Sequence, residues 1–99
     1  MTRDQIIKFV ALQAKWKKAS AVMHANHIEM QRKYGSIYQP SWLKSGDYRK
    51  REEIQEREYK AYKTFIDWIE TNVPGIRFEG IPVRRFAEMN YREVEKLAR

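Results

Sequence analysis

The chain has 99 residues, with 20 Lys and Arg against 13 Asp and Glu, a net charge of +7 and no cysteine. A chain of this length fits one domain, taken as 1–99, with a modest core. The absence of cysteine excludes disulfide scaffolds, Cys-ligated zinc and thiol nucleophiles. No apolar run in the sequence is long enough to span a membrane, so we expect a soluble cytoplasmic protein with no membrane partner.

The excess positive charge lies in the first half of the chain. Residues 1–51 hold eleven Lys or Arg and three acids, whereas residues 52–99 hold nine basic and ten acidic residues. Such asymmetry is typical of a surface for phosphates, anionic lipid or an acidic protein, although a net charge of this size also serves solubility alone.

A first helix is predicted over about 3–34. Thr2 and Gln5 have the spacing of a capping box, and Gly35 suits a helix end because glycine tolerates positive φ. Between them, residues recur at alternating steps of three and four and predict one stripe along the helix: Phe9, Leu12, Trp16, Ala19, Met23, Asn26, Met30 and Lys33. Such a helix is roughly 48 Å long. The protein must therefore be elongated, bent or oligomeric.

A second helix is predicted over about 47–72, capped by Ser45 or Asp47 and ended by a turn at Pro74. Its first half has Ile54 as its only aliphatic residue and offers Glu53–Arg57 and Glu56–Lys60 as i,i+4 ion pairs. Its second half carries an apolar stripe: Tyr59, Tyr62, Ile66, Ile69 and Val73. The aliphatic packing is therefore expected away from the connection between the two helices.

A C-terminal helix is predicted over about 83–98, after an extended connector. Pro82 suits its first turn, and Asn90 with Glu93 could cap a fresh start within it, so one bent helix and two short ones are both compatible. The predicted fold is all-α: a long antiparallel helical hairpin, about 3–34 and 47–72, with the C-terminal helix packed at its open end.

The connector between the long helices, residues 34–51, is the strongest functional signal. It interleaves aromatic and basic side chains around Gly35, Pro40 and Gly46. Lys and Arg neutralise phosphates, and Tyr and Trp stack on bases, so this tip suits single strands, flipped bases or nucleotides. The same residue types form hot spots of protein interfaces. In the structural alternative, Trp42 and the tyrosines fold inward and hold the loop down.

A basic flank on the first helix could lead a phosphate backbone towards the tip. Lys15 and Lys18 lie on it, as does Lys8. The alternative is a solvated flank whose long stems cover apolar neighbours. The residues predicted to bind nucleic acid or a partner are Lys15, Lys18, Arg32, Lys33, Tyr38, Trp42, Lys44, Tyr48, Arg49, Lys50 and Arg51.

Enzymatic, metal and cofactor chemistry find little support in the sequence. No nucleotide-binding or nucleophile motif occurs, and the carboxylates of residues 52–56 have basic partners at helical spacing. His24 and His27 are three residues apart but lack further ligands for a metal site. We therefore expect a non-enzymatic protein without metal or cofactor.

The predicted function is binding of nucleic acid or a nucleotide through the basic, aromatic tip. The alternatives are a protein-interaction module, such as an inhibitor or adaptor for an acidic or nucleic-acid-binding protein, and a structural subunit of an assembly. The first helix also has more apolar width than one partner helix needs, with Ile6, Val10 and Val22 beside its stripe. A homodimer would bury this excess, unless the C-terminal helix covers it.

Overall fold

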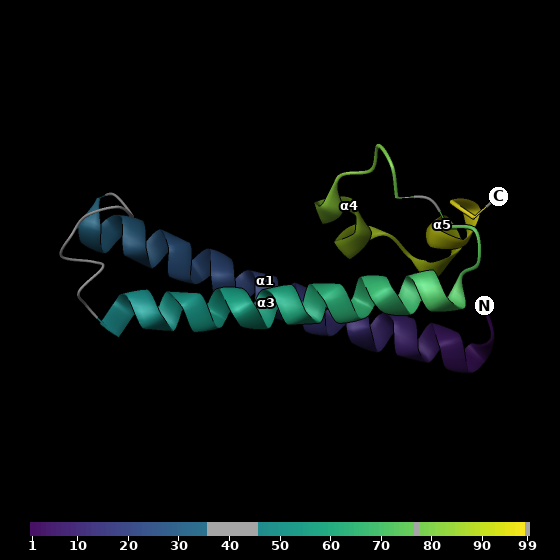
Figure 1. Ribbon diagram of the computed structural model, residues 1–99, viewed down its shortest axis with the longest axis horizontal. Helices are drawn as coiled ribbons and strands as arrows, with labels where there is room; N and C mark the ends of the chain where they lie inside the picture. The colour runs from purple at the N-terminus through teal and green to yellow at the C-terminus, as the bar shows by residue number, and fades with distance from the viewer. Residues whose placement is uncertain (36–45, 77, 99) are drawn as a thin grey trace.

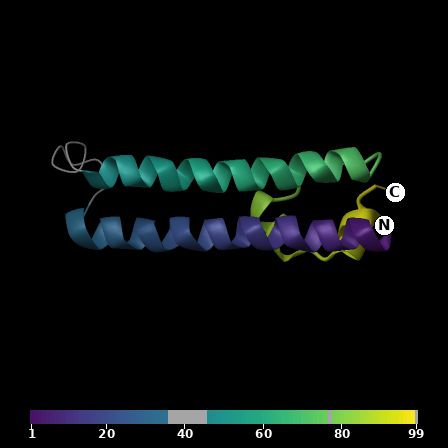
Figure 2. The ribbon, with the colours of Figure 1, turned by 90° about the horizontal axis from the view of Figure 1, so that it is seen from below.

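The computed structural model describes residues 1–35, 46–76 and 78–98. Within these residues the chain is helical and holds no strand, and its elements are α1 (Arg3–Tyr34), α3 (Gly46–Asn72), α4 (Val83–Glu88) and α5 (Tyr91–Lys96). α1 and α3 run antiparallel and side by side along the whole molecule (Figures 1 and 2). The predicted all-α helical hairpin is confirmed.

Both ends of α1 form as the sequence predicts. At the start, the Gln5 amide donates to Thr2 Oγ1 at 3.2 Å and the Thr2 amide donates to Gln5 Oε1 at 2.9 Å, which completes the capping box. At the other end, Gly35 has a φ of 70° and its amide donates to the Gln31 carbonyl at 2.8 Å. A side chain at Gly35 would be strained at this φ, so the glycine fixes where α1 stops.

α3 begins at Gly46, one residue before the predicted start, and is tied to α1 there by Asp47. Lys33 Nζ lies 2.7 Å from Asp47 Oδ2, and the Tyr34 hydroxyl donates to the same oxygen at 2.6 Å. These bonds join the last turn of α1 to the first turn of α3. They set the register of the two helices at the tip end of the hairpin.

The core lies mainly at the end of the hairpin that holds both termini. Phe9 packs its ring 5.2 Å from the ring of Phe65, and Trp16 lies 5.7 Å from the same ring. Residues of α3 and the C-terminal segment complete this cluster: Ala61, Ile69, Val73, Phe86, Met89 and Val94. Towards the tip, the described buried residues are Asn26, Met30 and Ile54. Tyr59, which its spacing placed in the packing stripe, is instead 56% exposed.

The C-terminal segment forms two short helices instead of one bent helix. α4 ends before Met89, and Asn90 caps α5 by accepting from the Glu93 amide at 2.9 Å. We call residues 81–98 the arm. Gln13 of α1 holds it by donating to the carbonyls of Phe86 and Met89, at 2.9 and 2.6 Å.

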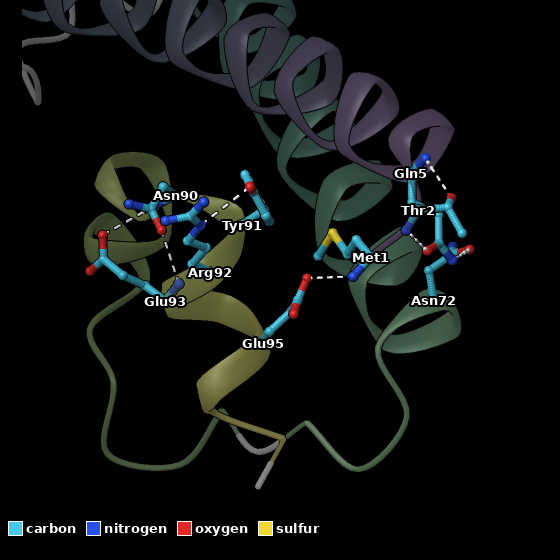
Figure 3. Close-up of polar contacts among 9 residues, drawn as sticks. All are labelled: Met1, Thr2, Gln5, Asn72, Asn90, Tyr91, Arg92, Glu93 and Glu95. Carbon is cyan, nitrogen blue, oxygen red and sulfur yellow. Dashed lines mark hydrogen bonds and ion pairs between the residues drawn. The ribbon is translucent and has the colours of Figure 1, made fainter.

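A second attachment closes the end of the molecule where the termini meet. The Met1 amino group lies 2.5 Å from Glu95 Oε1, with the amino-terminal residue's side chain 2% exposed (Figure 3). Figure 3 also shows the capping box at Thr2 and the Asn90–Glu93 cap on either side of this ion pair. The arm is thus fixed at two places, to α1 at Gln13 and to the Met1 amino group that precedes α1.

The arm covers only one face of the hairpin. Figure 1 shows α4 and α5 above the two long helices, and Figure 2, seen from below, shows the opposite face with the arm behind it. The molecule measures 50 × 26 × 18 Å, and its radius of gyration of 16.6 Å exceeds the value of about 13 Å for a compact domain of this length. The hairpin therefore has an open face along its full length.

None of the described helices combines the length and the apolar composition that a membrane span requires.

Candidate nucleic-acid interface

The open face carries a groove between α1 and α3, which we call the basic groove. It encloses about 380 Å³. Apolar residues form its floor and basic residues its rims; the lining consists of Leu12, Lys15, Lys18, Ala19 and Val22 from α1 and Arg57, Lys60, Ala61 and Thr64 from α3. No carboxylate occurs among these described lining residues.

Helical spacing explains why the rims are basic on both sides. Lys15, Lys18 and Val22 recur at steps of three and four, and Arg57, Lys60 and Thr64 recur at the same steps on α3. The Trp16 indole donates to Glu58 at 2.9 Å and fixes the local register of the two helices. This register brings Lys18 across from Arg57, and Lys15 across from Lys60.

Of the four groove cations, Lys60 makes an ion pair in the described part of the chain and the other three do not. Lys60 Nζ lies 3.2 Å from Glu56 Oε1, which confirms one of the two ion pairs that spacing predicted. The other, between Glu53 and Arg57, does not form. Among the described residues, Lys15, Lys18 and Arg57 have no ion pair within 4.0 Å. Like charges thus face each other across the groove, a cost that a bound polyanion would remove.

At the tip end, the predicted residues divide into exposed and engaged side chains. Arg32, Arg49 and Lys50 are exposed. Lys33 instead bonds to Asp47; its pKa is raised by that hydrogen bond, while the hydrogen bonds from Lys33 and Tyr34 lower the pKa of Asp47.

Tyr48 is half-buried, and its pKa is raised by the hydrogen bond between its hydroxyl and Glu52. It is therefore less available for stacking than the sequence suggested. Tyr38, Trp42 and Lys44 lie outside the described residues.

Arg51 does not join the other predicted residues. It is half-buried and lines a second groove on the covered face, between the hairpin and α4. His24 and His27 line the same groove. No group of three His, Asp or Glu side chains able to hold a metal ion occurs in the ranges that the structure describes. The predicted site is thus divided between opposite faces of the hairpin.

The basic groove has two functional candidates that the sequence did not single out, Arg57 and Lys60. Their spacing to Glu53 and Glu56 assigned them to ion pairs within one helix. The sequence does carry a signal for them, which is the excess of basic residues at matching helical steps on both long helices. Reading that signal requires the register between the two helices, which the sequence alone does not give. Comparisons of the chain with protein-family models, curated proteins and solved structures give no match.

Proposed function

We propose that the protein is a small, non-enzymatic helical protein that binds nucleic acid through the basic groove and the exposed cations of the tip. The observation that carries this proposal is the paired arrangement of cations: Lys15 and Lys18 on one rim, Arg57 and Lys60 on the other, with no acid among the described lining residues. Cations in two rows can follow one phosphate backbone from both sides. Arg49 and Lys50 would extend this track towards the tip.

Counterion release predicts how strongly the affinity for nucleic acid depends on salt concentration. Each phosphate that a Lys or Arg neutralises contributes about 0.7 to 0.9 to the slope of log K against log salt concentration. Four groove cations therefore predict a loss of affinity of about 50- to 150-fold between 50 and 200 mM salt. Because these contacts reach the backbone and not the base edges, little sequence preference is expected.

The test is fluorescence anisotropy with labelled single- and double-stranded oligonucleotides at the two salt concentrations. The double variant Lys18→Glu/Arg57→Glu should lose most of the affinity, because it places two acids on facing rims. The control Arg3→Glu/Lys63→Glu makes the same change in net charge at exposed positions outside the groove. Equal losses in both double variants, or binding by the wild-type protein without salt dependence, would refute the groove as the interface.

The apolar floor of the basic groove favours a second candidate function, binding of an acidic amphipathic helix from another protein. Val22 is 49% exposed above the floor formed by Leu12, Ala19 and Ala61. A helix with one apolar row and flanking acids would fill such a groove. Val22→Ser should weaken that complex and leave nucleic-acid affinity unchanged, so the same anisotropy assay with a labelled acidic helical peptide separates the two functions.

A further inference from the structure

The groove on the covered face, which we call the arginine groove, is larger and chemically different from the basic groove. It encloses about 810 Å³ between α1, α3 and α4. Arg51, His24 and His27 line it together with apolar side chains that include Met23 and Ala87. The volume lies in the range of pockets that hold small organic ligands.

Arg51 is the lining residue with a buried nitrogen that lacks a hydrogen-bond acceptor in the described part of the chain. Its guanidinium is part of a half-buried side chain, and the Nη1 nitrogen is buried without a hydrogen-bond partner among the described residues. A buried charged donor that makes no hydrogen bond lowers stability. An anion with several acceptor oxygens would satisfy the planar fork of donors that arginine presents.

The two histidines line the same groove as Arg51. His24 and His27 are three residues apart on α1, so they face the groove from successive turns. The bonds from Trp16 to Glu58 and from Tyr34 to Asp47 set the register, which brings His27 across from Arg51. Three nitrogen-bearing side chains, those of His24, His27 and Arg51, thus line the groove.

The acids of the arginine groove are already engaged. Glu58 Oε1 accepts from the Trp16 indole at 2.9 Å and from the Ser20 hydroxyl at 3.3 Å. Glu88 lies 3.7 Å from Lys17 Nζ. Arg84 of α4 also lines the groove and makes no ion pair in the described ranges. Three basic residues, Lys17, Arg51 and Arg84, against the two acids Glu58 and Glu88 leave the lining of the groove with a net positive charge.

We propose that the arginine groove binds a small phosphomonoester, with its phosphate between Arg51 and the two histidines and its organic part along Met23 and Ala87. The site does not depend on the proposed function, because it lies on the opposite face of the hairpin. α4 borders the groove, so a ligand of mononucleotide size suits it better than a continuous strand.

Proton NMR of the full chain can test the site directly. The chain has 2 histidines, so both imidazole signals report on this groove. Titration with inorganic phosphate and with adenosine monophosphate should shift both signals, and the nucleotide should bind more tightly because it also contacts the apolar wall. If neither imidazole signal shifts with about 10 mM phosphate or about 10 mM adenosine monophosphate, the proposal is overturned.

Variants test whether phosphate binds at Arg51 or at other cations of the protein. Arg51→Met should weaken phosphate binding at least about tenfold, and Arg51→Lys should weaken it less, because it keeps the charge and loses the fork. Arg3→Met, which changes an exposed arginine outside both grooves, should bind as the wild-type protein does. Lys18→Glu/Arg57→Glu should leave phosphate binding intact even if nucleic acid no longer binds. Equal affinity in Arg51→Met and Arg3→Met, each shown to be folded by circular dichroism, would refute the assignment.

Discussion

Asn26 offers a substitution that should stabilise the protein. It is 5% exposed in the seam between the long helices, and its Oδ1 is buried without a hydrogen-bond partner among the described residues. A buried acceptor without a partner costs about 1–3 kcal/mol. Leucine has a similar shape, carries no polar atom and favours the helix by a few tenths of a kcal/mol more than asparagine. Asn26→Leu should therefore raise the free energy of unfolding by about 1–3 kcal/mol.

Urea unfolding followed by circular dichroism at 222 nm measures this change. The midpoint should rise while the slope stays constant, because the surface exposed on unfolding is unchanged. In thermal unfolding, each kcal/mol should raise Tm by about 4–8 °C for a domain of this size. Gln31→Leu is the matched control, since it makes a polar-to-leucine change at an exposed position of the same helix and should shift stability by less than about 0.5 kcal/mol.

Loss of stability in Asn26→Leu would refute this reasoning. It would mean that the Asn26 Oδ1 has a hydrogen-bond partner in solution. Size-exclusion chromatography of the variant should accompany the measurement, because a buried asparagine in a helical seam can also fix which helices associate.

Three further outcomes follow from the contacts described. Val94→Ala should lower the free energy of unfolding by about 2 kcal/mol in urea titrations, because the side chain is fully buried where the arm meets the core; an unchanged midpoint would mean that the arm does not stabilise the hairpin. Trp16→Phe should cost about 1.5–3 kcal/mol, because the half-buried Glu58 carboxylate loses its indole donor; Trp16→Phe in a Glu58→Gln background should cost less. Hydrogen bonds from Lys33 and Tyr34 lower the pKa of Asp47, which contributes stability that is present above the ordinary carboxylate pKa of about 4 and is lost as pH falls through the folded-state pKa. Between pH 5 and pH 2, the urea midpoint should therefore fall more for the wild-type protein than for Asp47→Asn. Parallel curves for the two proteins would contradict this expectation.

The helices could be predicted from the sequence because their signals are local. The capping box at Thr2, the positive φ at Gly35 and the cap at Asn90 each involve residues within one turn, and each forms as the spacing indicates. The concentration of core residues near the termini was also predictable, because the apolar stripes of both long helices weaken towards the tip. Tyr59 is the exception, since a tyrosine at helical spacing can lie at the edge of a stripe as readily as inside it.

The surfaces could not be predicted because they depend on which face the arm covers. Periodicity places Lys15 and Lys18 on one flank of α1 and Gln13 on the other, but only the hydrogen bonds of Gln13 to the arm decide which flank stays open. Arg51 is next to Lys50 in sequence, yet successive residues are about 100° apart around a helix, and Arg51 lines the arginine groove whereas Lys50 does not. A cluster in sequence is therefore not a cluster in space along a helix.

The hairpin buries fewer of its described residues towards its tip than near the termini, so its two halves should differ in how readily they open. Local unfolding needs less free energy where few apolar side chains are buried, so amide hydrogens in α1 beyond Asn26 and in α3 before Ile54 should exchange with solvent through partial opening. Amides around Phe9 and Phe65 should exchange only when the whole domain unfolds. The half of the hairpin that the arm braces thus serves as a rigid base, and the other half is the part of the molecule that can adjust its shape to a partner.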